Sequence, residues 1–296
     1  MSGIIDEIKQ SFRRGDALIK LIYVNVFVFL VVKLIEVSSF VSQASFGGTI
    51  PQLFMCPAWV PDILSQPWGL FTYMFLHQGF LHVLFNLLWL YWIGYIFIDF
   101  LNGKRLVAVY IFGGLSGAGL YILAYNMFPV FMPENSYMLG ASASVMAIVL
   151  AITVYVPNYT LYLVFIGPVK LKWVALVSVV LDVITLADGN PGGHIAHLGG
   201  AVFGLYWGFK LKNGTDITKW SYRVSDGIAG LFKPKSKVKM YYNSGSAYKA
   251  GKATPHANDN LSKSELDAIL DKISKSGYES LSAAEKEKLF QASKMK

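Results

Sequence analysis

Two serines and a few polar side chains within apolar stretches are the residues of this sequence that could do chemistry. Ser142 and Ser144 stand in the stretch LGASASVMAI, and His82 and Asn86 lie four residues apart in another apolar run. His197 follows in the stretch GGHIAHLGG. A serine, an imidazole that accepts its proton, and donors that stabilise a developing oxyanion make up a nucleophilic acyl-transfer site. These residue types therefore predict acyl transfer through a serine nucleophile.

The composition places these residues in a membrane protein. Of the 296 residues, 54% are hydrophobic and only 15% are charged, and the mean hydropathy is +0.45. Such values are unusual for a soluble domain. Apolar windows of about 20 residues, long enough to span a bilayer, occur near 17–40, 79–100, 105–128, 139–156, 171–188 and 194–211. The sequence therefore predicts an all-α membrane protein with six transmembrane helices.

Lysine and arginine are unevenly distributed among the loops that join these segments. They occur before the first apolar segment, between the second and third, between the fourth and fifth, and after the sixth. These residues are Lys9, Arg13, Arg14, Lys20, Lys104, Arg105, Lys170, Lys172, Lys210 and Lys212. Residues 41–68, 129–138 and 189–193 contain none. Because cytoplasmic loops are enriched in these residues, both termini are predicted to be cytoplasmic.

The N-terminal region predicts a retained first helix. The first 16 residues are polar, and the apolar run after them is too long for a signal-peptide core. The absence of a targeting segment fits a bacterial plasma (inner) membrane. Cys56 is the only cysteine, which excludes an intramolecular disulfide and a cysteine-based metal cage.

The region after the last apolar segment predicts a linker and then a small helical hairpin. Ser262 with Glu265 and Ser282 with Glu285 have the spacing of a capping box at a helix start. We assign this hairpin no chemistry, and its partner stays unknown. The predicted organisation is a cytoplasmic segment, a six-helix domain, a basic juxtamembrane segment with a linker, and a cytoplasmic hairpin, at residues 1–16, 17–212, 213–260 and 261–296.

Glycines in the last apolar segment predict a close contact with the fourth. Gly200, Gly204 and Gly208 recur at intervals of four, a pattern that lets two helices approach backbone to backbone. The segment at 139–156 has small residues on one face and is the natural partner. This pairing brings His197 towards Ser142.

The predicted topology puts the polar groups at one depth. The second, fourth and sixth helices all enter from outside, so His82, Asn86, Ser142 and His197 fall in the outer third. We expect no carboxylate at this depth, and therefore a dyad instead of a triad. Asp182 is expected to make a structural or interfacial contact.

In combination, these motifs resemble the rhomboid intramembrane serine proteases. The resemblance covers about residues 17–212 and rests on His77 with His82-x-x-x-Asn86, on Gly140-x-Ser142, and on Ala196-His197 before Gly200-xxx-Gly204. It implies a six-helix rhomboid-like bundle and a Ser142 nucleophile with His197 as general base. Oxyanion stabilisation would come from His82, Asn86 and the Ser142 backbone.

The resemblance also implies the substrates and partners. These would be single-span membrane proteins, cut in or near their transmembrane segment, together with the lipid bilayer. No cofactor, metal or nucleic acid would take part. Ser142 is favoured over Ser144 because it is the third residue of Gly-x-Ser, and because Ser144 is rotated by about 200° on a helix.

The sequence departs from the family pattern at three points. Ala143 replaces the usual glycine after the nucleophile, and Met146 replaces an aromatic residue that often stacks on the histidine. The external loop has Trp68-Gly69 in place of a Trp-Arg pair. These changes affect the loop and pocket more than the predicted chemistry.

Two alternatives remain open from the sequence. The first is a catalytically inactive rhomboid-like protein that binds membrane clients, although such relatives typically lose the serine or the histidine. The second is a transporter or metal protein in which His77, His82, His194 and His197 hold a cation, disfavoured because acidic partners are lacking. If His194 binds no cation, we expect it to hydrogen-bond to loop backbone or water. Trp89 is expected to be a core or lipid-facing residue.

Overall fold

A computed structural model describes residues 12, 15–131, 136–163, 166–222 and 263–294. These residues fall into two compact units on either side of residue 235, and each unit is described by itself. Most of the predicted N-terminal segment, the basic juxtamembrane segment after residue 222 and the linker lie outside the described residues.

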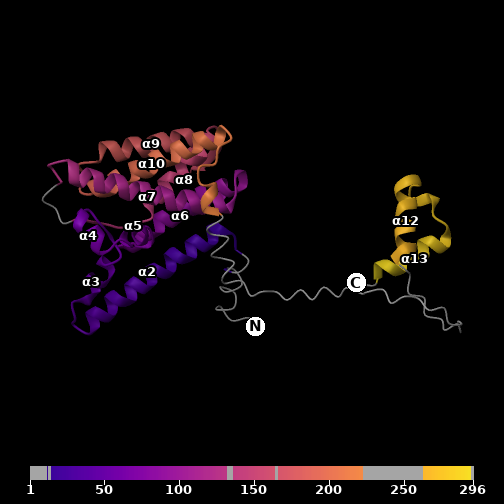
Figure 1. Ribbon diagram of the computed structural model, residues 1–296, viewed down its shortest axis with the longest axis horizontal. Coiled ribbons are helices and arrows are strands. Elements are labelled where there is room, and N and C mark those ends of the chain that lie inside the picture. The colour runs from indigo at the N-terminus through magenta and orange to yellow at the C-terminus, as the bar shows by residue number, and fades with distance from the viewer. Residues whose placement is uncertain (1–11, 13–14, 132–135, 164–165, 223–262, 295–296) are drawn as a thin grey trace. The chain divides into compact units, whose positions relative to one another are not determined.

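A helix occupies each of the six apolar windows (Figure 1). The bounds of these helices are Ala17–Val41 for α2, Phe80–Phe100 for α6, Gly103–Met127 for α7, Ser142–Tyr155 for α8, Leu171–Ile184 for α9 and Pro191–Lys212 for α10. Among the described residues, α2, α6 and α7 are long and apolar enough to cross a membrane. The count of six spans and the cytoplasmic termini stay predictions.

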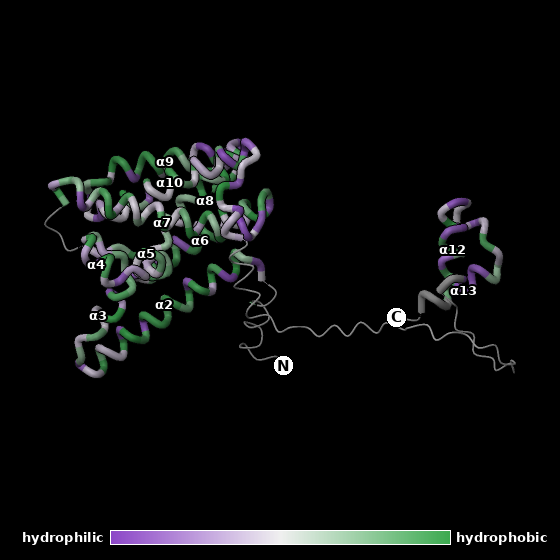
Figure 2. The backbone as a smooth tube through the Cα atoms, viewed as in Figure 1, coloured by the Kyte–Doolittle hydropathy of each residue, from purple (hydrophilic) through white to green (hydrophobic). Residues whose placement is uncertain are grey.

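The outer surface of these helices is apolar (Figure 2). Leu34 and Phe40 on α2 are 69% and 84% exposed, and Ile184 on α9 is 66% exposed. A water-soluble protein rarely exposes large apolar patches of this kind. Surfaces of this composition fit a surrounding of lipid, in which the helices satisfy their own backbone hydrogen bonds.

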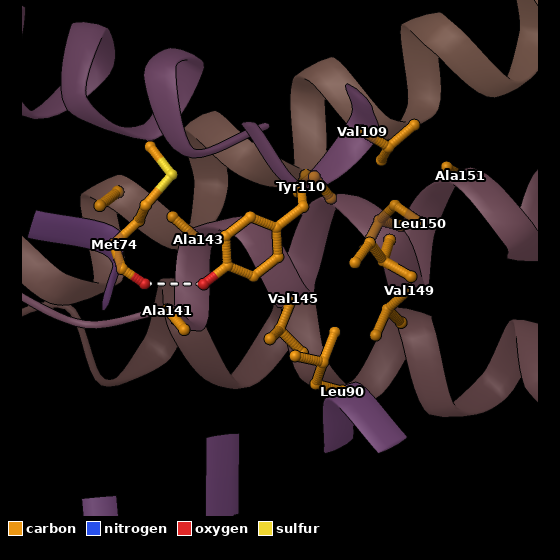
Figure 3. Close-up of a cluster of buried hydrophobic side chains, with 14 of the residues drawn as sticks. Met74, Leu90, Val109, Tyr110, Ala141, Ala143, Val145, Val149, Leu150 and Ala151 are labelled. Atoms are coloured by element: carbon orange, nitrogen blue, oxygen red, sulfur yellow. Dashed lines mark hydrogen bonds between the residues drawn. The ribbon is translucent and has the colours of Figure 1, made fainter. Parts of the chain in front are cut away.

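Helix α8 lies at the centre of the first unit and contacts α6, α7, α9 and α10. Nearly all its residues from Ala143 to Val154 are buried. Its start is fixed by the core around Tyr110, whose hydroxyl donates to the Met74 carbonyl at 2.8 Å, beside Ala141 and Ala143 (Figure 3). The element that begins with the candidate nucleophile is therefore held on all sides.

The glycines of α10 pack directly against the backbone of α8. A Cβ at Gly200 would collide with the Ala143 carbonyl oxygen, and a Cβ at Gly204 would collide with the Ala147 carbonyl oxygen. One turn further, a Cβ at Gly208 would lie 2.9 Å from the oxygen of Ala151. This contact has the backbone-to-backbone geometry expected from the glycine spacing.

Short elements connect α2 to α6 and brace the loop before α8. Their bounds are Phe46–Gln52 for α3, Cys56–Pro57 for β1, Val60–Ser65 for α4, Gly69–Thr72 for α5 and Tyr73–Phe75 for η1. Strand β1 pairs antiparallel with β2, Tyr137–Met138, which leads towards α8. A second antiparallel pair joins β3, Thr160–Leu163, to β4, Gly167–Lys170.

The two strand pairs depart from the all-α expectation. Each strand has four residues or fewer, too short for an alternating pattern to be recognised. The described part of the chain is therefore mostly helical, with two small antiparallel additions.

The loop position with Trp68-Gly69 is stabilised without an arginine. The Trp68 indole nitrogen donates to the Leu53 carbonyl at 2.7 Å. Gly69 packs so closely on Met55 that a Cβ would collide with its carbonyl oxygen. This part of the loop is thus held by an indole hydrogen bond and a close backbone contact.

The second unit is a helical hairpin made of α12, Lys263–Ser276, η2, Tyr278–Ser280, and α13, Ala283–Lys294. The capping box of α13 is formed: the Ser282 amide donates to Glu285 Oε2 at 2.7 Å, and the Glu285 amide donates to Ser282 Oγ at 3.3 Å. The hydrogen bond from the Ser282 amide and the Lys272 ammonium at 2.9 Å together lower the pKa of Glu285 to about 2. Ser262, predicted to cap the first helix, lies outside the described residues.

Candidate active site

Ser142 is the first residue of α8, directly after a turn that needs a glycine. Gly140 has φ +128°, a conformation that L side chains rarely adopt, and its amide donates to the Tyr73 carbonyl at 3.0 Å. At a helix start the backbone N–H groups have no intrahelical acceptor. The Ser142 N–H is consequently available to a ligand, next to its own hydroxyl.

The two serines have different surroundings. Ser142 is partly exposed and lines a cavity, whereas Ser144 is fully buried. The Ser144 hydroxyl points to Met74 Sδ at 3.9 Å. Only the Ser142 hydroxyl is positioned to meet a substrate.

A cavity of about 310 Å³ brings together polar residues from four helices. Asn86 comes from α6, Ser142 from α8, Asp182 from α9 and His197 from α10. The remaining lining is mainly apolar and comprises Phe85, Trp89, Val145, Met146, Val149, Ser178 and Leu181. Trp89, expected in the core or facing lipid, thus contributes to the wall of this cavity.

Asp182 is the residue that the sequence reasoning assigned wrongly. Its Oδ1 accepts a hydrogen bond from His197 Nδ1 at 2.8 Å, so a carboxylate does lie at the depth of the histidine. Helix α9 runs antiparallel to α10, and the end of one helix therefore meets the start of the other. The sequence position could have indicated this contact, because Asp182 lies two residues before the end of α9 and His197 lies near the start of the next helix.

His194 shares this carboxylate. Its Nδ1 donates to the same Asp182 Oδ1 at 2.9 Å, and its Nε2 lies 3.4 Å from the Thr185 hydroxyl. The expected bond to loop backbone or water is therefore replaced by side chains of α9 and the turn after it. Asp182 is 6% exposed, and its second oxygen, Oδ2, has no hydrogen-bond partner in the described structure.

His82 and Asn86 take different positions around the serine. The His82 ring and the Ser142 hydroxyl both lie next to the turn at Gly140. A Cβ built on Gly140 would be 3.0 Å from His82 Nε2 and 3.6 Å from Ser142 Oγ. The Asn86 amide nitrogen donates to the His82 carbonyl at 2.9 Å within α6. His82 itself faces a neighbouring cavity of about 760 Å³.

His77 lies against His82 and not against His197. The two rings meet edge to face with centroids 5.1 Å apart, and both residues line the larger cavity. His77 is 1% exposed. The four-histidine cation site considered from the sequence is therefore not assembled, because His77 and His82 meet at the larger cavity whereas His194 and His197 meet at Asp182.

Sequence comparisons agree with this architecture. A model of the rhomboid domain matches residues 64–214, which hold the whole cavity and half of the chain. The chain belongs to the rhomboid family. A second model, a family of unknown function (DUF6576), matches residues 257–295, the region of the hairpin.

Three curated relatives are rhomboid proteins. Rhomboid-related protein 1 of Caenorhabditis elegans is 28% identical over 54% of this chain and 44% of its own length. RHOMBOID-like protein 12, mitochondrial, of Arabidopsis thaliana is 27% identical over 49% of this chain and 46% of its own length. Rhomboid protease GlpG of Haemophilus influenzae is 27% identical over 56% of this chain and 81% of its own length. The chain thus spans less than half of the first two relatives.

Within the rhomboid domain, two departures from the family pattern lie in α8. Met146, in place of an aromatic residue, lines the same cavity as His197. Ala143 packs its backbone on Gly200, so its methyl group does not prevent the close approach of α8 and α10. With both residues in place, Ser142 and His197 line one cavity.

Proposed function

We propose that this rhomboid protein is an intramembrane serine endopeptidase that cleaves single-span membrane proteins in or near their transmembrane segment. The observation that carries the proposal is the shared cavity of Ser142 and His197, with the far ring nitrogen of His197 bonded to Asp182. Because Nδ1–H donates a hydrogen bond to the Asp182 carboxylate, Nε2 is left without a proton and can act as a base. The sequence resemblance and the relationship to a rhomboid protease support the same reaction.

In the proposed mechanism, His197 Nε2 takes the proton of the Ser142 hydroxyl while Oγ attacks the scissile carbonyl carbon. The oxyanion of the tetrahedral intermediate accepts hydrogen bonds from the Ser142 N–H and from the side chains of Asn86 and His82. The imidazolium then donates its proton to the leaving amine. A water molecule, activated by the same imidazole, releases the acyl group from Ser142.

Asp182 would act as a positioning residue for His197. Its carboxylate holds the imidazole in the tautomer with a free Nε2, and it offsets the positive charge of the imidazolium that forms during attack. This arrangement extends the expected dyad to a triad of Ser142, His197 and Asp182, with His194 as a second donor to the carboxylate.

The cavity walls agree with a hydrophobic substrate. Phe85 and Trp89 of α6 face Val145, Met146 and other apolar residues across the cavity, an environment in which an apolar peptide segment is favourably buried. The proposed location is a plasma membrane of bacterial type, with the catalytic cavity towards the outer side.

Cleavage of a model single-span substrate in proteoliposomes tests the proposal. Ser142→Ala and His197→Ala are each expected to abolish cleavage, because they remove the nucleophile and the base. Ser144→Ala is the matched control and should keep most of the activity, since its hydroxyl is buried against Met74.

A serine-directed fluorophosphonate probe separates this proposal from a client-binding protein without protease activity. The wild type should be labelled and Ser142→Ala should not. Absence of labelling in a folded wild type, or equal labelling of Ser142→Ala, would count against an enzyme.

A further inference from the structure

The cluster of Asp182, His194 and His197 has the composition of a metal site. One potential ligand atom from each residue lies within 4.8 Å of the others. Imidazole nitrogens and a carboxylate oxygen are among the ligands that Zn²⁺ takes in proteins. His194 and His197 are one helical turn apart on α10, so both can turn to the same ion.

The carboxylate provides an independent indication of a ligand. Asp182 is only 6% exposed, yet its Oδ2 is without a hydrogen-bond partner in the described part of the chain. Buried polar atoms almost always have partners, and an exception calls for a water or an ion. A cation bound at this carboxylate would reduce the cost of burying its charge.

The cluster is also accessible and nearly of the right size. The side chains of His194 and His197 are 21% and 22% exposed, and His197 lines the open cavity. Their nitrogens lie 2.9 and 2.8 Å from Asp182 Oδ1, whereas ligands of a tetrahedral zinc ion are about 3.3 Å apart. A shift of about half an ångström would therefore admit the ion and leave the fourth position to water.

We propose that Asp182, His194 and His197 form a Zn²⁺ site and that occupation of this site inhibits the protein. The inhibition rests on the proposed protease function, but binding of the ion does not. Bound zinc would take the Nδ1 lone pairs of His194 and His197, and in each neutral imidazole the proton would move from Nδ1 to Nε2 through solvent. An imidazole with Nε2–H cannot accept the Ser142 proton, so the base is lost without any change of net charge on the ring.

Calorimetry with ZnCl₂ tests the binding independently of catalysis. The full chain carrying Ser142→Ala, in detergent micelles, is expected to bind one Zn²⁺, and adding His194→Gln or Asp182→Ala should weaken this binding at least tenfold. The matched control adds His256→Gln, which changes the remaining histidine of the sequence outside the rhomboid domain, and should bind as before. Unchanged affinity in the His194→Gln and Asp182→Ala proteins would overturn the site.

Cleavage assays test the inhibition. Each rate is compared with that of the same variant without zinc: wild-type activity should fall at least tenfold with saturating ZnCl₂ and return with a chelator, whereas His194→Gln should need at least tenfold more zinc. Mg²⁺, which prefers oxygen ligands, should have no effect. Equal zinc sensitivity of wild type and His194→Gln would overturn the proposal. If the wild type cleaved nothing, the protease proposal would fail while calorimetry still decided the zinc site.

Discussion

At the scale of single residues, Asp182 has the clearest consequence for the proposed chemistry. One of its oxygens receives hydrogen bonds from both His194 and His197. A carboxylate in this position fixes the tautomer of the base and stabilises its charged form. The proposed reactivity of Ser142 should therefore depend on a residue that acts through His197.

We predict that Asp182→Asn lowers kcat by between about 10-fold and 10⁴-fold, the upper value being that of the corresponding change in a serine protease with a Ser-His-Asp triad. An amide can present its NH₂ group to Nδ1 and favour the wrong tautomer. KM should change little, because Asp182 is proposed to act through His197. Steady-state kinetics in proteoliposomes measure both constants.

Asp182→Glu is the matched variant for this prediction. It keeps the charge and the acceptor, so it should recover part of the lost kcat. A purely structural role would instead lower the folded fraction of Asp182→Asn and leave kcat per labelled serine intact. A rise in KM with unchanged kcat would likewise contradict the positioning role.

At the scale of elements, the spacing of α8 and α10 positions the serine and the histidine. Two carbonyl oxygens of α8, at Ala143 and Ala147, occupy the space that side chains at Gly200 and Gly204 would need. The sequence predicts this contact because the four-residue repeat of glycine is periodic on a helix. The site thus depends on an interface that tolerates no added atoms.

Gly204→Ala is predicted to destabilise the protein by about 1–3 kcal/mol, the usual cost of an additional group in a packed interface. The collision is with backbone, which cannot rotate away. Gly119→Ala in α7 is the control, since a Cβ there meets nothing within 4 Å and alanine is a better helix former. Thermal unfolding in detergent should show a lower Tm for Gly204→Ala only. Equal midpoints for both variants would contradict the packing argument.

At the scale of the whole molecule, the helices and their motifs could be predicted from the sequence because they are periodic. Contacts between residues far apart in the chain could not. The six apolar windows coincide with helices, and the motif residues Asn86, Ser142 and His197 reach one cavity. The carboxylate of Asp182 was not expected beside His197, because the two residues are on antiparallel helices. Their positions in the sequence alone do not show that they lie at the same depth. The β1–β2 pair joins residues far apart in the sequence, and its two-residue strands have no recognisable period.

The end of α10 is tied back to the start of α7 by a cluster around Asp216. The Arg105 guanidinium donates to Asp216 Oδ2 at 3.0 Å, and the hydroxyls of Thr218 and Tyr222 donate to the same carboxylate at 2.7 and 2.8 Å. The Thr218 hydroxyl in turn accepts from the Trp207 indole at 3.0 Å. This cluster joins segments more than a hundred residues apart and should stabilise the first unit as a whole.

Asp216→Asn is predicted to destabilise the protein by about 1–3 kcal/mol at neutral pH, because the charged acceptor of several donors is lost. Burial raises the pKa of Asp216, but bonds from Thr218, Tyr222 and Arg105 outweigh this and hold it below the usual 3.8. A lowered folded-state pKa stabilises the protein above the unfolded value, and this contribution is lost as the pH falls through the folded value. The Tm difference between wild type and Asp216→Asn should therefore be full at pH 7 and shrink below about pH 4. Asp188→Asn, at an exposed position, should change Tm little at either pH, and a Tm difference for Asp216→Asn that grew on acidification would contradict the argument.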